Sequence, residues 1–419
     1  MSSANALWRD RDFVRLWLAQ SVSAFGARIT REGLPIAAVL TLGASPAQLG
    51  LLAALSHGPA LIVGLAAGGL VDRSKRRGLM MGADLVRAVV LATIPIAALL
   101  HVLALPQLYV AAAVVGAASV LFEIADHAYL PSLVARDQIT EANSSFAATE
   151  SVAEIGGPAL AGVLFQVLAA PIAIAANAVT YLISAVFLAG IRTVEPTPEP
   201  EPHARWTDDV RLGFRTALGH PLVRPVFLSS WMQALAGGMF GALYIIFCVR
   251  TVGLNPGLLG LTIAAGGVGA LIGAVVAGWL SRRLGVGPSF LGAQALVALA
   301  IAIIPLSPGN PAHGMPFLVV SQILGDAFGV ATLILGTSLI QTVTPLAVLG
   351  RVNATFKAVS GGLAVLGAIL GGLLGEAIGV RGAIWIGVAG LAIAPLFSLP
   401  GPLKRLRRMP TGPDQEVRP

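Results

Sequence analysis

The stretch Gly-Gly-Leu-Val-Asp-Arg-Ser-Lys-Arg-Arg, residues 68–77, lies between two long apolar runs and decides the fold class of the chain. Gly68 has no side chain and lets one helix end pack closely against another. Asp72, four residues later, can accept hydrogen bonds from backbone N–H groups or from an arginine. The basic cluster behind it is typical of the cytoplasmic side of a membrane protein. The pattern predicts a cytoplasmic turn between two membrane helices, and an ordinary basic loop is the plainer interpretation.

Composition places the whole chain in a membrane. Its 419 residues are 56% hydrophobic and 11% charged, whereas a soluble domain is about 25% charged. The net charge of +7 is explained by basic cytoplasmic loops, so we expect no nucleic-acid partner. The single cysteine, Cys248, excludes a disulfide framework and a cysteine-rich metal site. We expect no metal and no cofactor.

Apolar runs of membrane-spanning length recur along the sequence, and the alternating pattern of a barrel strand is absent. Because only helices and closed barrels satisfy their backbone in lipid, we predict an all-α polytopic membrane protein with twelve transmembrane helices. Lys and Arg gather in alternate loops, and the outside loops hold only Arg250 and Arg381. This asymmetry predicts a cell (inner) membrane protein with both termini in the cytoplasm. The predicted spans are residues 13–41, 47–71, 78–101, 106–127, 143–168, 171–191, 222–249, 257–281, 286–306, 315–342, 353–378 and 381–400.

A long polar interruption divides the predicted spans into two groups of six. Residues 193–202 carry proline at every second position near their end, which favours an extended, semi-rigid tether. A short surface helix is predicted over 207–218, and a merely solvated linker fits as well. We therefore divide the chain into an N-terminal six-helix half (1–192), a cytoplasmic linker (193–220), a C-terminal six-helix half (221–402) and a basic cytoplasmic tail (403–419).

The two halves repeat each other at a constant offset of 210 positions. Asn143 and Phe146 match Asn353 and Phe356, and Gly157 matches Gly367. The stretches 45–51 and 68–73 also match 255–261 and 278–283 in the same register. A parallel repeat of two six-helix halves is the architecture of major facilitator transporters, in which the substrate site lies between the halves.

The quoted stretch resembles the major facilitator superfamily signature Gly-x-x-x-Asp-Arg-x-Gly-Arg-Arg, with Lys75 in place of one glycine. Residues 83–88, Ala-Asp-Leu-Val-Arg-Ala, resemble a motif of the bacterial drug:proton antiporter branch, which includes macrolide-efflux proteins and the enterobactin exporter. The resemblance implies a cytoplasmic gate made from these two stretches. Its candidate residues are Gly68, Asp72, Arg73, Arg76, Arg77, Asp84 and Arg87.

A second motif lies in the fifth span. Residues 153–162 resemble the antiporter motif Gly-x-x-x-Gly-Pro-x-x-Gly-Gly, keeping Gly157, Pro158 and Gly162 and replacing two glycines by alanine. Small residues at this spacing allow close helix packing, so the motif predicts a packing device shared by exporters. The fourth span lacks the arginine that many proton antiporters carry there.

Charged residues inside the predicted spans are the proton-coupling candidates, since such residues are costly in a bilayer and usually functional. Glu150 and Glu154 lie one turn apart, and Asp326 is central in the tenth span. Glu150 is also close enough to the cytoplasmic end to be simply solvated. Arg28 and Glu32 are four residues apart and are expected to pair on one helical face. The substrate-cavity candidates are Arg31, Glu32, Gln20, Gln233 and Gln322.

The sequence holds no phosphate-binding loop, no Cys-x-x-Cys and no His-Glu-x-x-His, so we expect a protein that is not an enzyme. We predict a monomeric secondary active transporter that exports a small amphipathic molecule, such as a drug, macrolide or siderophore, in exchange for protons. The resemblance also connects such a protein with multidrug resistance. The alternatives are a lysophospholipid or other lipid transporter, an importer of the same fold, and a membrane receptor or scaffold that transports nothing.

Overall fold

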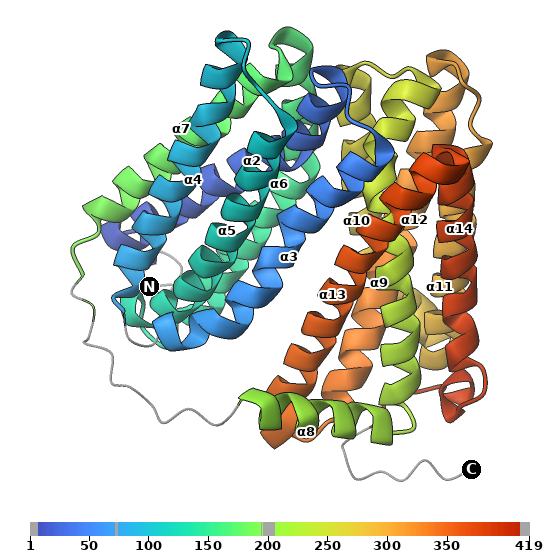
Figure 1. Ribbon diagram of the computed structural model, residues 1–419. Helices are drawn as coiled ribbons and strands as arrows, with labels where there is room; N and C mark the ends of the chain where they lie inside the picture. Colours follow the sequence, from blue (N-terminus) through green and yellow to red (C-terminus); the bar gives the residue numbers. More distant parts are fainter. Residues whose placement is uncertain (1–6, 72–73, 194, 196–205, 411–419) are drawn as a thin grey trace. The chain divides into compact units, whose positions relative to one another are not determined.

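The computed structural model describes residues 7–71, 74–193, 195 and 206–410. The chain forms two compact units: unit 1 contains residues 1–44 and 55–203, and unit 2 contains residues 45–54 and 204–419. Within the described ranges the secondary structure is helical (Figure 1). The predicted all-α fold with twelve long helices is confirmed.

The first six long helices are α2 (Arg11–Leu40), α3 (Pro46–Val71), α4 (Arg76–Leu99), α5 (Leu105–Leu133), α6 (Ile139–Val167) and α7 (Ala170–Gly190). The other six are α9 (Val223–Ile246), α10 (Pro256–Leu284), α11 (Val286–Ala302), α12 (Pro311–Val343), α13 (Leu346–Ile378) and α14 (Val380–Ile393). A π-helix, Phe247–Val252, extends α9. Short 3-10 segments follow α11 and α14, at Ile304–Leu306, Ala394–Ser398 and Pro402–Arg405.

Ten of these helices are long and apolar enough to cross a membrane. The two others, α2 and α6, carry five of the charged candidates that the sequence places inside predicted spans: Arg28, Arg31, Glu32, Glu150 and Glu154. These charged residues lower the hydropathy of α2 and α6, and they are also the candidate functional residues.

Local sequence explains where several helices begin and end. Asn255 caps α10 by accepting a hydrogen bond from the backbone N–H of Leu258 at 2.8 Å, and a proline follows each of the caps Asn255 and Asn310. Proline is favoured in a first helical turn because its missing N–H would be unpaired there. Gly285 has φ 93° between α10 and α11, which a side chain would disfavour.

The same helix pairs pack in the two units. In unit 1, α2 packs on α6 and α7, and α4 packs on α5 and α7. In unit 2, α9 packs on α13 and α14, and α11 packs on α12 and α14. Phe146 and Phe356, which match in the repeat, contact Phe13 of α2 and Phe227 of α9, at ring-centroid distances of 5.9 and 5.0 Å.

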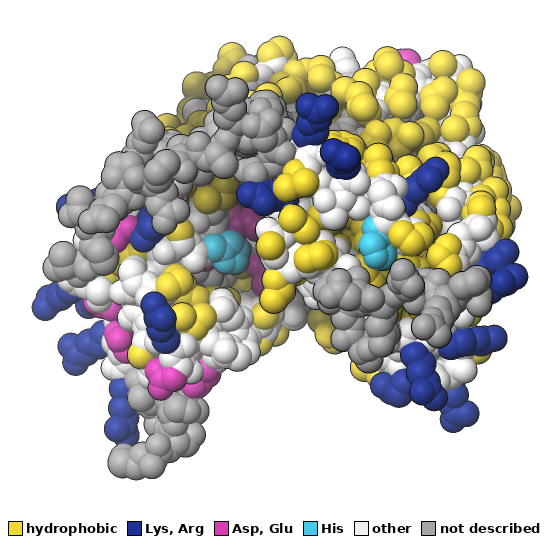
Figure 2. Space-filling view, turned by 90° about the horizontal axis from the view of Figure 1, so that it is seen from below, with side chains coloured by type: hydrophobic (Ala, Val, Ile, Leu, Met, Phe, Trp, Pro, Cys, Tyr) yellow, Lys and Arg dark blue, Asp and Glu magenta, His cyan; other side chains and the backbone are white. Residues whose placement is uncertain are grey.

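The predicted surface helix is α8 (Trp206–Gly219). It lies across the ends of α9 and α13 (Figure 1). A side chain at Gly213 would come within 2.2 Å of the Thr355 hydroxyl on α13, so glycine permits this close approach. The face that bears α8 also displays many of the Lys and Arg side chains (Figure 2).

Candidate functional site

Five charged side chains of α2 and α6 form a network in unit 1, which we call the charge cluster: Arg28, Arg31, Glu32, Glu150 and Glu154. The Arg28 guanidinium pairs with Glu150 and lies 2.5 Å from the Glu154 carboxylate. Arg31 lies 3.4 Å from Glu154 and 3.6 Å from Glu32. Three carboxylates thus face two guanidinium groups. The cluster has a formal charge of −1 when all its members are ionised, and one added proton makes it neutral.

Burial differs sharply among these side chains. The Arg28 and Glu32 side chains are 13% and 10% exposed, whereas those of Arg31, Glu150 and Glu154 are 58%, 56% and 44% exposed. The cluster therefore has a buried base and an accessible rim. The exposed Glu150 and Glu154 both pair with the buried Arg28.

The predicted pairing of Arg28 with Glu32 is wrong. Arg28 reaches instead to α6, because its aliphatic stem lies against Gly157. A Cβ at Gly157 would be 2.6 Å from Cγ of Arg28, so the glycine lets α2 approach α6 closely. Glu32 pairs with Arg31. Pro158 and Gly162 of the same motif are buried in α6.

The repeat shows that the charge cluster is not a shared packing feature. The positions matching Arg28 and Glu154 are Gly238 and Ala364 in unit 2. A Cβ at Gly238 would lie 2.1 Å from the Ala364 carbonyl oxygen, so α9 and α13 cross almost backbone to backbone. The same helix crossing therefore holds ion pairs in unit 1 and none between these positions in unit 2.

A second polar contact joins α2 to α5. Gln20, a predicted cavity residue, donates a hydrogen bond to the Asp126 carboxylate. Glu123 and His127 lie nearby on α5, 4.0 Å apart and largely exposed. Unit 1 thus carries two further carboxylates on α5, Glu123, which is exposed, and Asp126, which is partly buried.

Asp84 and Arg87, two of the gate candidates, form an ion pair that is buried within unit 1. The Arg87 guanidinium lies 4.1 Å from the ring centre of Tyr181 on α7 and 4.7 Å from that of Phe122 on α5. Such cation–π contacts stabilise a desolvated guanidinium. The pair therefore joins α4, α5 and α7.

The structure describes only part of the candidate gate stretch, residues 68–77. Gly68 lies in α3, and Asp72 and Arg73 lie outside the described residues. Arg77 donates hydrogen bonds to the carbonyl oxygens of Leu188 and Ala189 at the end of α7, at 2.8 and 2.6 Å. These bonds satisfy carbonyls that a helix end leaves unpaired.

Glu195, which the sequence did not single out, binds the start of α4. Its carboxylate accepts hydrogen bonds from the backbone N–H groups of Arg76 and Arg77, at 2.8 and 3.3 Å. A helix N-terminus favours such an anion. Asp12 binds the preceding residues, accepting bonds from the N–H groups of Arg192 and Thr193 at 3.0 and 2.8 Å. Together Asp12 and Glu195 fasten the beginning of the linker to unit 1, and we call them the linker clasp.

Asp326 and Gln322 lie on one face of α12 in unit 2. A Cβ at Gly266 of α10 would be 2.0 Å from the Asp326 carboxylate and 3.4 Å from the Gln322 amide nitrogen. Glycine at position 266 thus makes room for both side chains. Asp326 is exposed, and Gln322 is partly buried.

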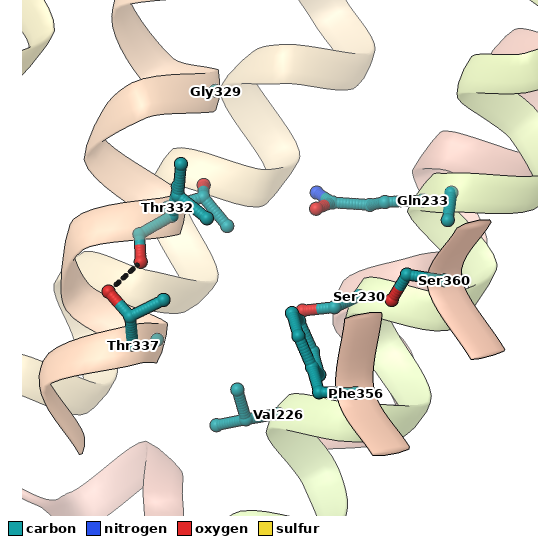
Figure 3. A pocket seen from close by; sticks show the side chains of 11 residues that line it. Val226, Ser230, Gln233, Gly329, Thr332, Thr337, Phe356 and Ser360 are labelled. Carbon is teal, nitrogen blue, oxygen red and sulfur yellow. Dashed lines mark hydrogen bonds between the residues drawn. The ribbon is translucent and has the colours of Figure 1, made fainter. Parts of the chain in front are cut away.

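Gln233, the remaining cavity candidate, lines a pocket of about 300 Å³ within unit 2. Its side chain extends from α9 toward α12 (Figure 3). The pocket lies between α9, α12 and α13 and combines aromatic, aliphatic and polar neutral residues. Sequence inspection missed its other polar members, although the 210-residue offset relates two of them, Ser230 and Ser360, to Gln20 and Glu150.

Comparisons with known proteins agree with the family resemblance seen in the sequence. Residues 2–416 match the model of the transmembrane secretion effector family of major facilitator proteins. The chain is 28% identical to an enterobactin exporter, EntS, of Citrobacter koseri over 409 residues, which cover 96% of this chain and 95% of the relative. It is 27% identical to an uncharacterized MFS-type transporter, YfiS, of Bacillus subtilis over 383 residues, or 88% of each chain.

Solved structures show the same fold. A bacterial homologue of the iron transporter ferroportin in an inward-facing state matches with a TM-score of 0.75 and 17% identity, over 93% of this chain and 98% of that one. A bacterial homologue of the lysosomal transporter Spinster matches with a TM-score of 0.72 and 15% identity, over 94% and 97%. The twelve-helix fold, the repeat and the family match lead to one conclusion: this chain belongs to the transmembrane secretion effector family of the major facilitator superfamily and is a multi-pass membrane transporter.

Proposed function

We propose that the protein exports a small amphipathic molecule in exchange for protons, by alternating access between its two six-helix halves. The observation that carries the proposal is the charge cluster of unit 1, in which three carboxylates share two guanidinium groups. Ionisable groups in membrane helices mark proton and substrate pathways. The direction of transport is supported by the relatives named as enterobactin exporters.

The charge balance of the cluster supports the proposed proton coupling. A proton on Glu154 removes the partner that Arg28 and Arg31 share, and leaves Arg28 paired with Glu150. The contact between α2 and α6 loosens because the two ion pairs that Glu154 makes with Arg28 and Arg31 are weakened. Loss of the proton restores these ion pairs and the negative charge of the cluster. This exchange provides two states of one helix pair, which an alternating-access cycle requires.

The deprotonated state attracts cationic groups to unit 1. Glu150 and Glu154 are accessible on α6, and Glu123 is exposed on α5. Asp326 provides a second candidate proton site in unit 2, on a different helix pair. We further propose an inner-membrane location with both termini in the cytoplasm, a monomer, and the proton gradient as the driving force without a cofactor. In this scheme the stretch 68–77 closes the cytoplasmic side.

The test uses cells stripped of their own efflux pumps. Accumulation of dyes, macrolides and siderophores is measured with and without a protonophore, for wild type, Glu154→Gln and Asp326→Asn. Glu141→Gln is the matched control, because Glu141 lies in the first turn of the same helix as Glu154, outside the charge cluster. We expect wild type and Glu141→Gln to lower the accumulation of at least one compound, and the protonophore or Glu154→Gln to abolish the effect.

Other outcomes select among other functions. Raised accumulation in wild-type cells would identify an importer. Export that is unchanged by the protonophore and by both acid substitutions would refute proton coupling. If the level of every compound is unchanged but a labelled lysophospholipid is exported, the substrate is a lipid. If nothing is transported, the result favours a receptor or scaffold.

A further inference from the structure

The pocket of unit 2 differs in chemistry from the charge cluster of unit 1. Eleven residues line it, and none of these described side chains is ionisable. Its polar members are Ser230, Gln233, Thr332, Thr337 and Ser360, and the Phe356 ring lies among them. A volume of about 300 Å³ is at the small end of ligand-binding sites, enough for a ring system with its substituents.

The 210-residue repeat explains why this pocket is neutral. The positions that match Glu123, Asp126 and Glu150 of unit 1 are Leu333, Gly336 and Ser360. All three line the pocket. Each of these three acidic side chains of unit 1 is therefore replaced by an uncharged residue at the equivalent place in unit 2. In the case of Asp126 the replacement is glycine, which also removes the side chain that binds Gln20 in unit 1.

Three polar atoms of the pocket have unused hydrogen-bonding capacity. The amide nitrogen of Gln233 and the hydroxyl oxygens of Thr332 and Ser360 are buried and have no hydrogen-bond partner among the described residues. Burying such groups unpaired costs free energy. Figure 3 shows the Gln233 side chain directed from α9 into the space toward α12, where Thr332 lies.

Thr337 provides the contrast. It lines the same pocket and lies on the same helix as Thr332, but its hydroxyl donates a hydrogen bond to the Leu333 carbonyl oxygen at 2.7 Å (Figure 3). Its bonding needs are met within the helix. The unpaired state of Thr332 is thus a property of that position and not of threonines in this helix.

We propose that this pocket binds the uncharged, ring-bearing part of the exported molecule, with Phe356 against the ring and with Gln233, Thr332 and Ser360 as its hydrogen-bonding groups. The inference rests on the proposed export function and specifies its substrate. Unit 2 recognises the neutral portion of an amphipathic molecule, while unit 1 provides the acidic surface and the proton site. Selectivity and proton coupling are then carried by different helices.

Thiol labelling tests the pocket without any transport. The single native thiol, Cys248, is completely buried, so wild type serves as the blank. Leu333→Cys places a thiol in the pocket, and Glu123→Cys places one at the matching position of unit 1. The two native side chains are similarly exposed, Leu333 at 56% and Glu123 at 69%. Each purified variant in lipid nanodiscs is labelled with uncharged benzyl methanethiosulfonate and with cationic 2-(trimethylammonium)ethyl methanethiosulfonate.

The measured quantity is the ratio of the two labelling rates, normalised to the same ratio for free thiol. We expect the uncharged reagent to be favoured at Leu333→Cys, and the ratio to be roughly tenfold higher there than at Glu123→Cys, where neighbouring carboxylates attract the cation. Equal ratios at the two positions, or faster cationic labelling at Leu333→Cys, would overturn the proposal.

A transport measurement tests the hydrogen-bonding role. Export of the uncharged dye Nile red is followed for wild type, Thr332→Val and Thr337→Val, two substitutions of the same shape in the same pocket. Loss of one ligand hydrogen bond predicts a KM that is roughly threefold to tenfold higher in Thr332→Val, with an unchanged KM in Thr337→Val. Equal KM values in these two variants would contradict the role of Thr332.

The two experiments separate the two claims. A wild-type protein that exports no compound defeats the proposed function, and the labelling ratio alone then decides the neutrality of the pocket. Export that persists with wild-type KM in Thr332→Val and in Gln233→Leu would leave the function standing and refute the pocket as its binding site.

Discussion

Gly156 and Gly157 are neighbours in α6, yet they have different surroundings. A Cβ at Gly157 would lie 2.6 Å from the Arg28 side chain, whereas a Cβ at Gly156 would lie 3.7 Å from Phe25, an ordinary contact. One methyl group at position 157 must therefore move Arg28 or separate α2 from α6. The geometry of the charge cluster depends on this single missing side chain.

We predict opposite effects of alanine at these two positions. Gly156→Ala gains helix propensity, up to about 1 kcal/mol, and keeps transport. Gly157→Ala loses this gain to overpacking, which costs roughly 1–3 kcal/mol, and reduces transport because Arg28 is displaced. Thermal unfolding of the purified variants and dye export measure the two effects. A Gly157→Ala protein as stable and active as Gly156→Ala would show that α2 and α6 do not cross here as described.

The two acids that pair with Arg28 are not equivalent. Glu154 is shared by Arg28 and Arg31, whereas Glu150 pairs with Arg28. We therefore predict that Glu154→Gln lowers proton-driven export by at least tenfold, and that Glu150→Gln lowers it less, because Glu154 continues to hold both guanidinium groups. The check is the initial export rate of one dye at a fixed proton gradient. A larger loss in Glu150→Gln would reverse the assignment of the proton site.

At the scale of helices, the linker clasp joins three elements of unit 1. Asp12 lies in the first turn of α2, and it binds backbone N–H groups just beyond the end of α7, while Glu195 binds those at the start of α4. The Thr193 hydroxyl adds a further bond to Asp12 at 2.8 Å. The beginning of the linker is thus a fixed part of unit 1.

Asp12 gives the clasp a defined pH dependence. It precedes the predicted first span, and burial alone would raise its pKa, but hydrogen bonds from Thr193, Arg192 and Arg15 outweigh burial and lower the pKa below its ordinary 3.8. A carboxyl with a lowered pKa adds stability that is present above its unfolded pKa and is lost as the pH falls through the folded value.

We predict that Asp12→Asn lowers the free energy of unfolding by roughly 1–3 kcal/mol at neutral pH. The difference from wild type should stay constant down to about pH 4 and shrink below it, as the wild-type carboxyl becomes protonated. Thermal unfolding of the purified protein across this range provides the measurement. A difference that grows on acidification would mean that Asp12 is held in its neutral form.

The elements themselves were predictable because each has a local cause. Apolar runs placed most ends of the long helices within about four residues. The largest deviations lie at single helix ends: α5 continues to Leu133, α13 begins at Leu346, and α14 ends at Ile393, where a 3-10 segment follows. An apolar run alone does not mark the residue at which a helix begins or ends.

The candidate site was less predictable because it depends on contacts between helices. The sequence identified Arg28, Glu150, Glu154 and Gly157 separately. Their meeting depends on where α2 crosses α6, which periodicity along one helix does not give. Glu195 was missed because a lone glutamate among prolines resembles any solvated linker residue, whereas the N–H groups that it binds belong to a helix more than a hundred positions earlier.

At the scale of the whole molecule, the repeat has diverged in chemistry while keeping its helix packing. Unit 1 places acids and arginines where unit 2 has glycine, alanine, serine and a neutral pocket. Such asymmetry is expected when one half carries the proton and the other recognises an uncharged group. A symmetric packing requirement would have kept the same small residues in both halves.

The central claim is that export is driven by protons that bind the charge cluster. It is tested most directly with purified protein in liposomes that contain a pH-sensitive dye, where proton movement is recorded when a transported compound is placed on one side. The account predicts that in wild type protons move in the direction opposite to the compound. This proton movement is lost in Glu154→Gln and kept in Glu141→Gln. Transport of the compound without proton movement, or equal proton movement in Glu154→Gln and wild type, would contradict it.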